Sequence, residues 1–193
     1  MKARILLWVI LLTISSCKKE AVVGKHQMDD FFNLKLFIEQ EVQRLEKNSC
    51  SIYKSGEING VSDQKSIPSQ NFNWENEFQI LADMDIRKSS WLDYFTIDTT
   101  QTVNEDFGEV SVIKYHTNNT KIPIKDIEII FSLKDFNKPI LIKTKRVSNN
   151  WIFKSKQEVQ YHIGIGLQAE GYEKILWLKE KYFNITSIYK CHS

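Results

Sequence analysis

Hydrophobic side chains recur at steps of three and four residues between positions 31 and 45, and mostly polar side chains fill the positions between them. An apolar stripe with this period is typical of an amphipathic helix that packs one face against a core. Asp29 and Asp30 precede the stripe and can cap its first turn, so we expect a helix that ends near Asn48. The stripe consists of Phe31, Leu34, Ile38, Val42 and Leu45.

The next segments predict a strand, a loop and a second helix. Residues 51–58 are expected to form a short strand, because the Asn59-Gly60 pair that follows favours a tight hairpin turn. Residues 62–73 are polar and include Pro68, which predicts a loop. A second helix is expected from Trp74 to about residues 88–90, since Trp74, Phe78, Leu81 and Ala82 share one helical face.

From Gly108 onward the period of the pattern changes to two, which predicts strands. Residues 151–163 alternate most clearly, with an apolar side that includes Trp151, Phe153 and Tyr161. One packed face and one wet face are typical of an antiparallel sheet. We therefore predict an α+β fold in which N-terminal amphipathic helices pack on a curved, mainly antiparallel meander in the C-terminal half. The expected strands are 109–117, 125–133, 139–147, 151–163, 171–178 and 182–190.

The N-terminal segment has the pattern of an export signal. Lys2 and Arg4 precede the apolar run 5–12, which is too short for a membrane-spanning helix of about 20 residues. Ser15-Ser16-Cys17 resembles a bacterial lipobox, and this resemblance implies that lipid is attached to Cys17. The alternative is an ordinary signal peptide that ends near a cysteine. We expect a signal peptide over 1–16, a lipidated tether over 17–28 and a single α+β domain over 29–193.

The residues after Cys17 indicate in which membrane the protein is anchored. No aspartate follows Cys17, so the usual inner-membrane retention cue of lipoproteins is missing. The segment Lys18-Lys19-Glu20 resembles the charged export signal of some Bacteroidetes surface lipoproteins. Both features indicate anchorage in the outer membrane and leave open whether the domain faces the periplasm or the cell surface.

The two halves of the chain carry opposite charge. Residues 17–107 hold 10 basic and 16 acidic side chains, whereas residues 108–193 hold 14 basic and 8 acidic ones. The halves either attract one another within the fold or present faces of opposite sign that orient the protein at an anionic membrane. We expect no nucleic-acid partner for an exported, nearly neutral protein.

Cys50 and Cys191 are the two cysteines that remain once Cys17 is assigned to lipid. An exported protein lies in a compartment that permits disulfides, so a bridge between the end of the first helix and the last strand is one interpretation. A pair of free, buried thiols is the other. Without a CxxC spacing, no redox motif is indicated.

Motifs for catalysis, metal or cofactor binding are weak. Residues 164–169 match GxGxxA, but strand patterns follow where a dinucleotide fold needs a helix, so we interpret the glycines as relaxing a tight connection. The sequence has no HExxH or GxSxG motif. We therefore expect no catalytic residues, no metal and no cofactor. His116 and His162 lie on expected strands and can meet across the sheet, but a zinc site needs a third and a fourth ligand. The other histidines are His26 and His192.

A group of lysines gives the sharpest surface prediction. If Asn149-Asn150 forms a two-residue hairpin loop, Lys145 faces Lys154 and Lys143 faces Lys156. Like charges directly opposite one another are destabilising, so such a patch would be explained by an anion that it binds, such as a lipid headgroup, lipopolysaccharide or acidic glycan. The alternative is a solvated edge whose lysines discourage aggregation.

Three pieces of the chain together carry a resemblance. They are the first helix, the second helix with Asp83-Met84-Asp85-Ile86 and Trp91, and the segment from Trp151-Ile152-Phe153-Lys154-Ser155 to Gly171-Tyr172-Glu173-Lys174-Ile175. These pieces resemble a group of uncharacterised Bacteroidetes outer-membrane lipoproteins of similar length. A more distant fold analogy is to lipoprotein carriers of the LolA/LolB type. The resemblance implies an address and a fold but no activity.

Three functions remain as hypotheses. The first is a lipid-anchored, non-catalytic envelope protein that binds an apolar or amphiphilic ligand in a cleft between sheet and helices. The second is a structural subunit that docks another envelope protein through an exposed apolar patch. The third is a hydrolase, which requires Asp83, Asp85 or His162 to converge in one pocket.

Overall fold

The computed structural model describes residues 26–48 and 50–191. These residues form two α-helices, three short 3-10 helices and nine strands, an α+β fold made mostly of strands. The helices are α1 (Leu34–Lys47) and α2 (Trp74–Ala82), with 3-10 turns η1 (Met28–Asp30), η2 (Ser69–Asn71) and η3 (Leu92–Tyr94). The strands are β1 (Cys50–Ile58), β2 (Val61–Pro68), β3 (Thr96–Asn104), β4 (Gly108–His116), β5 (Ile124–Ser132), β6 (Asp135–Asn149), β7 (Phe153–His162), β8 (Gly166–Ile175) and β9 (Lys181–Cys191).

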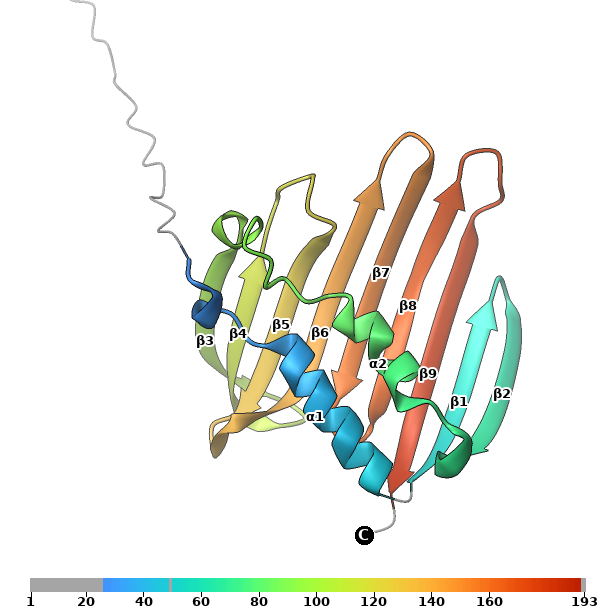
Figure 1. Cartoon of the computed structure of the whole chain (residues 1–193), viewed down its shortest axis with the longest axis horizontal. Coiled ribbons are helices and arrows are strands. Elements are labelled where there is room, and N and C mark those ends of the chain that lie inside the picture. Colours follow the sequence, from blue (N-terminus) through green and yellow to red (C-terminus); the bar gives the residue numbers. More distant parts are fainter. Residues whose placement is uncertain (1–25, 49, 192–193) are drawn as a thin grey trace, which may run out of the picture.

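All nine strands belong to one antiparallel sheet with the order β2-β1-β9-β8-β7-β6-β5-β4-β3 (Figure 1). Strands β3 to β9 form a meander in which each strand pairs with the next one along the chain. The β1–β2 hairpin adds to the far side of that meander, so β1 pairs with β9. The first and last strands of the chain are therefore neighbours.

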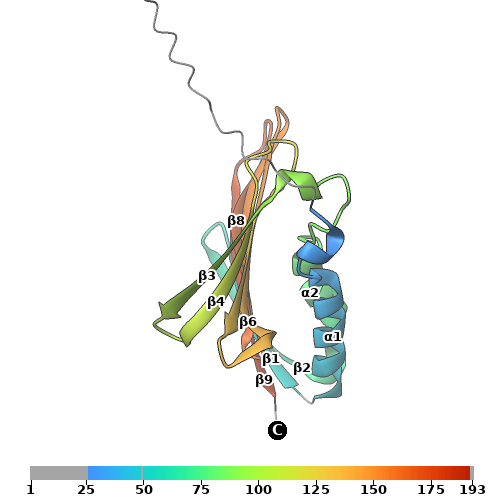
Figure 2. The ribbon, with the colours of Figure 1, turned by 90° about the vertical axis from the view of Figure 1, so that its left-hand side faces the viewer.

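Both helices lie in one layer beside one face of the sheet (Figure 2). The expected apolar stripe of α1 is buried, and α2 adds Trp74, Phe78 and Leu81 to the same core. These side chains pack on the sheet residues Ile52, Val159, Tyr161 and Tyr189, among others. A smaller cluster of Val110, Ile130 and Leu141 forms a second core on its own.

Asparagine side chains fix the start of each helix. Asn33 accepts a hydrogen bond from Leu36 N at 3.0 Å, and Asn73 accepts one from Asn76 N at 2.8 Å. Helix α2 ends at Ala82, earlier than the expected end near residues 88–90. Met84 and Ile86 are both buried, and a spacing of two residues fits extended backbone better than a helix.

Three sequence expectations about strands were wrong. Residues 61–68 form β2 and not a loop, because Asn59 and Gly60 make the expected turn with positive φ angles of 52° and 83° and the chain pairs back along β1. Strand β3 was missed because almost all of its side chains are exposed and polar. Strand β8 begins at Gly166, inside the segment interpreted as a connection.

None of the helices in the described part of the chain is both long and apolar enough to cross a membrane.

Candidate functional site

Side chains fill the space between the helices and the sheet. Phe78 of α2 lies edge-on against Tyr161 of β7, with ring centroids 4.8 Å apart, and Trp74 does the same with Tyr189 at 5.0 Å. Phe78, Tyr161 and Leu45 have no more than traces of exposed surface. The place where a carrier cleft was expected is therefore filled by side chains in the described part of the chain.

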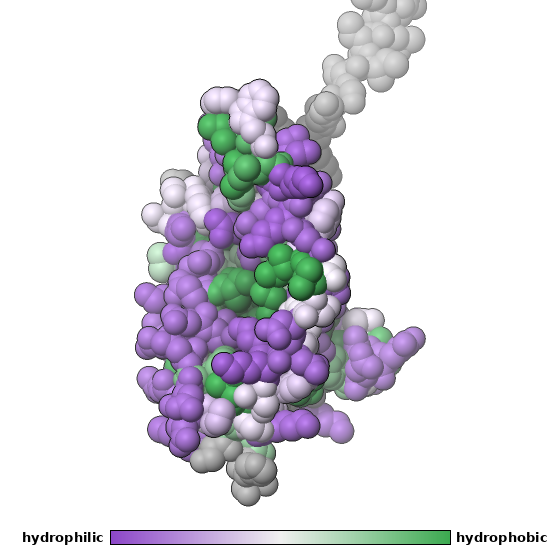
Figure 3. All heavy atoms as spheres, turned by 90° about the vertical axis from the view of Figure 1, so that its right-hand side faces the viewer, coloured by the Kyte–Doolittle hydropathy of each residue, from purple (hydrophilic) through white to green (hydrophobic). Residues whose placement is uncertain are grey.

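An apolar groove lies next to this core, on the β1–β2 hairpin. The helices cross one half of this sheet face, and the ends of the strands beyond them have no helix over them (Figure 1). The groove has a volume of about 570 Å³. Figure 3, which looks onto the β2 edge, shows an apolar area within a mainly hydrophilic surface. The apolar residues that line the groove are Ile58, Val61, Ile67 and Ile185.

Two lysines of this groove stand directly opposite each other. The β1–β2 register pairs Lys54 with Lys65, and both line the groove. Among the described residues no carboxylate forms an ion pair with Lys65, whereas Lys54 Nζ lies 2.6 Å from Glu77 Oε2. Like charges in opposed positions destabilise a hairpin, so this arrangement favours an anion in the groove. Asp63 also lines it, which places one acid near the two cations.

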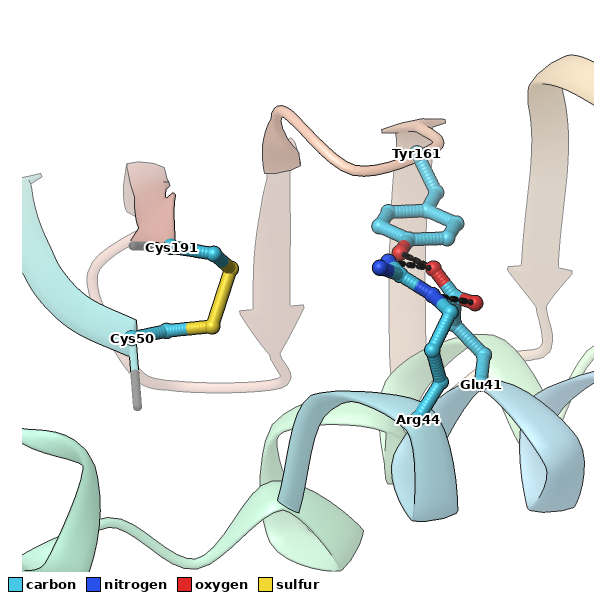
Figure 4. Close-up of a disulfide and its surroundings, with 5 residues drawn as sticks. All are labelled: Glu41, Arg44, Cys50, Tyr161 and Cys191. Atoms are coloured by element: carbon cyan, nitrogen blue, oxygen red, sulfur yellow. Dashed lines mark hydrogen bonds and ion pairs between the residues drawn. A yellow bond between two sulfur atoms is a disulfide. The ribbon is translucent and has the colours of Figure 1, made fainter. Parts of the chain in front are cut away.

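Glu77 is one of two buried glutamates whose side chains point from the helices toward the sheet. Besides Lys54, it lies 3.5 Å from the Tyr189 hydroxyl. The other is Glu41 of α1, which Arg44 binds with two donors at 2.7 and 2.8 Å (Figure 4). The Tyr161 hydroxyl donates a third hydrogen bond to Glu41. Each buried carboxylate thus has a cation and a phenol of its own.

Burial raises the pKa of the Tyr161 phenol, and the Glu41 carboxylate raises it further. The pKa of Tyr189 is raised for the same two reasons, burial first and then Glu77. The hydrogen bond from Arg44 to Glu41 raises the pKa of that guanidinium. Each phenol is a hydrogen-bond donor, and each carboxylate forms an ion pair with its own cation, Arg44 or Lys54. The arrangement fastens helices to sheet and has no paired acid and base for catalysis.

The predicted lysine pairs do not form. Strand β6 pairs with β7 so that Lys145 faces Glu158, while Lys154 faces Asn149. The reason is the turn: the Asn150 side chain accepts hydrogen bonds from Ile152 N and Phe153 N, which makes the loop longer than two residues.

The four lysines still project from the same sheet face, but most of them have acidic partners. Lys143 lies 3.5 Å from Glu128, and both Lys145 and Lys156 lie within 3.8 Å of Glu158. Anion binding by this group stays a prediction, and these ion pairs weaken it.

The structure joins Cys50 to Cys191 by a disulfide (Figure 4). The two cysteines are directly opposite each other at one end of the β1–β9 pair. Their sequence separation is 141 residues, so the bridge ties the edge hairpin to the last strand.

Residues considered for a hydrolase do not converge. Asp83 caps α2 and accepts a hydrogen bond from Gln79, and Asp85 accepts one from Arg87 N. His162 pairs in register with Leu141 and Gly166 on the sheet face away from the helices. His116 lies on β4, three strands from β7, and binds Asp126 at 2.7 Å.

The glycine motif forms a strand connection. Gly164 adopts a φ of +76° in the turn between β7 and β8, and a helix does not follow. Gly166 lies so close to β9 that an added Cβ would be 2.1 Å from the Ser187 carbonyl oxygen. The residues therefore permit a tight turn and close strand contact, without the helix that binds a dinucleotide.

Sequence reasoning missed the buried acids and the opposed lysines of the groove, although the sequence contains signals for both. Glu41 lies three residues after Ile38 and four before Leu45, which is a position of the apolar stripe. The Asn59-Gly60 turn fixes the register that brings Lys54 opposite Lys65.

Cys17 and His192 lie outside the described residues, so the lipidation prediction has no structural counterpart. Among the described residues no cluster of three or more metal-binding side chains occurs. No family of known proteins, no curated protein and no solved structure matches this chain.

Proposed function

We propose that this chain is a lipid-anchored, non-catalytic protein of the outer membrane that binds an amphiphile with an anionic head in the groove of the β1–β2 hairpin. The observation that carries the proposal is the opposed pair Lys54 and Lys65 beside an apolar groove. An acyl chain would remove Ile58, Val61 and Ile185 from water, and burial of apolar area is worth about 25 cal/mol per Å².

The lysines of the groove are the reason for proposing an anionic head group on the ligand. Lys54 already binds Glu77, so Lys65 is the cation of the pair that an incoming anion meets. A neutral amphiphile would leave Lys65 without a counter-charge, and a cationic one would place a further positive group beside it. Because Lys65 is exposed to solvent, its ion pair with a ligand contributes only about 1 kcal/mol, and the apolar contacts supply the rest of the affinity.

The lipid anchor is supported by sequence alone. Replacement of Cys17 by alanine is expected to abolish acylation and to release the protein from membranes. Retention of the Cys17→Ala protein in the membrane fraction with an uncleaved leader would point to an ordinary anchor sequence instead.

Native mass spectrometry of the chain from residue 18 onward tests ligand binding directly. All residues of the main core lie between Phe31 and Tyr189, so this shorter protein keeps the complete core. We expect a co-purifying mass that extracts into organic solvent as a lipid. A bare protein mass that also fails to take up added palmitic acid would overturn the proposal.

Matched variants locate the site. Lys65→Glu is expected to weaken palmitate binding about fivefold or more, because it converts an attraction into a repulsion. Lys190→Glu makes the same change in charge on the opposite face of β9 and is expected to leave binding unchanged. Equal losses in both variants would mean that total charge, and not the groove, controls binding.

A further inference from the structure

Two hairpin turns at one end of the sheet carry large hydrophobic side chains into solvent. The β6–β7 turn holds Trp151, which is 78% exposed, and the β8–β9 turn holds Trp177, which is 92% exposed. Figure 1 shows both turns at the same end, and Figure 3 shows hydrophobic residues gathered where β8 and β9 turn. We call this the tip surface, which consists of Trp151, Ile152, Leu176, Trp177 and Leu178.

The two turns form one unit. Leu176 N donates a hydrogen bond to Ile152 O at 2.7 Å, and β7 pairs with β8 up to Phe153 and Ile175. The apolar side chains of both turns are therefore held side by side. A joined surface of this kind is unlike the single exposed apolar residues that are normal on soluble proteins.

Trp177 also has an unusual backbone. Its φ angle is +71°, a left-handed conformation that favours glycine or asparagine and opposes bulky side chains. Within the fold this tryptophan covers almost nothing, since nearly all of its surface is in solvent. Folding alone gives no reason for an indole at this position.

Lysines surround the tip surface. Lys154 and Lys174 face each other on β7 and β8, directly behind the turns, and Lys179 and Lys181 follow Trp177. Glu173 and Glu180 are the acids in the same segments, so cations are in excess. Exposed tryptophan with flanking lysine is the composition of protein surfaces that enter the interface of an anionic bilayer. The lysine stems can lie along the acyl boundary while the ammonium groups meet phosphates.

We propose that the tip surface inserts into the interface of an anionic phospholipid bilayer, with Trp151 and Trp177 at the headgroup level and the four lysines on lipid phosphates. This contact needs no ligand in the groove, so it goes beyond the proposed function. It also needs no lipid anchor, and it would orient the domain with the strand ends toward the membrane.

Vesicle binding tests the proposal with the protein that begins at residue 18. The probes are vesicles of phosphatidylcholine, with and without phosphatidylglycerol, and a second set whose acyl chains carry bromine. We expect sedimentation with the anionic vesicles, weaker at high salt, and quenching of tryptophan fluorescence by bromine. The other tryptophans of this shorter protein are Trp74, which is buried in the core and contributes little to contact quenching, and Trp91, which is partly buried and gives a background signal.

The test variant is Trp151→Gln combined with Trp177→Asn, because asparagine tolerates the left-handed backbone at position 177. It is expected to lower vesicle partition by about tenfold or more and to reduce the bromine quenching to the background that Trp91 gives, while urea unfolding stays as in the original protein. Ile165→Gln, in the exposed β7–β8 turn at the other end of the sheet, is the matched control and should change neither.

Three results would overturn the proposal. They are no binding of the original protein to anionic vesicles, equal binding by the double variant, and an equal loss in the Ile165→Gln control. Self-association that the double variant abolishes, found by sedimentation without lipid, would assign the tip surface to a protein partner instead. Loss of palmitate binding in Lys65→Glu with vesicle binding intact would show that groove and tip act separately.

Discussion

Raising the pH above 10 is expected to destabilise this protein through the phenols that its helices bury. The pKa of an unfolded tyrosine is about 10, whereas the pKa values of folded Tyr161 and Tyr189 are raised by burial and by the nearby glutamates. Above pH 10 the unfolded chain therefore holds fewer protons than the folded one. Stability falls with pH wherever the unfolded state binds fewer protons.

The magnitude follows from the two phenols. Their stabilising contribution is complete below pH 10 and is lost as the pH rises toward the raised values. At a pH one unit above the ordinary value, each phenol costs about 1.4 kcal/mol, so the pair costs about 3 kcal/mol. The pKa of Tyr115 is also raised by burial, which adds to the loss. Marginally stable domains have about 5–15 kcal/mol in total, so this effect is large.

Urea unfolding at pH 9, 10 and 11, followed by far-ultraviolet circular dichroism, measures this loss of unfolding free energy. Tyr161→Phe is expected to reduce the pH-dependent loss by about 1.4 kcal/mol, because one ionising phenol is gone. Tyr94→Phe, at an exposed position, is the control. A pH dependence in Tyr161→Phe that matches the original protein would refute the reasoning that this phenol is buried beside a carboxylate.

Two further predictions concern the sheet. Cys50→Ala combined with Cys191→Ala opens a loop of 141 residues and is expected to lower the free energy of unfolding by about 3–5 kcal/mol in urea titrations, and a change of a few tenths would mean that the bridge adds no stability. Gly166→Ala is expected to cost about 1–3 kcal/mol or more, because its Cβ would meet the Ser187 carbonyl oxygen at 2.1 Å. Gly56→Ala is the control for the loss of glycine, because its added Cβ would be 3.7 Å from the nearest atom, Cγ1 of Ile185. Equal losses of unfolding free energy in the two variants would contradict the clash at Gly166.

Periodicity predicted the helices and most strands because each has one buried face. The α1 stripe is buried, and Val159 and Tyr161 of the β7 alternation are buried as well. Trp151 was expected on the same packed side, but it is exposed because it lies in the turn before β7. The prediction failed where a strand has no buried face, as in β2 and β3, whose side chains are nearly all exposed. For such strands the turn chemistry and the neighbouring strand decide the structure, and a local pattern contains little of that information.

The candidate groove and the lysine positions depended on register. A two-residue turn at Asn59-Gly60 gives the β1–β2 register directly, so the Lys54–Lys65 pair can be predicted from the sequence. At the β6–β7 turn the Asn150 side chain binds two backbone N–H groups and lengthens the loop, and that change moved every predicted lysine pair. Glu41 is one of the polar residues between the apolar positions of the first helix, and its burial was not predicted because its charge favours solvent.

The pairing of β1 with β9 has a consequence for the order in which the chain acquires its structure. A polypeptide that crosses a membrane with its N-terminal end first presents β1 long before β9 arrives. Until then one edge of the β1–β2 hairpin has unpaired N–H and C=O groups, and an isolated hairpin is only marginally stable. The core around β1 is also incomplete until β9 arrives, because Ile52 of β1 packs with Phe78 of α2 and Tyr189 of β9. Closure of the sheet is thus a late event whenever the chain emerges with its N-terminal end first, and chaperones that hold emerging chains have their greatest effect on this protein before its final strand appears.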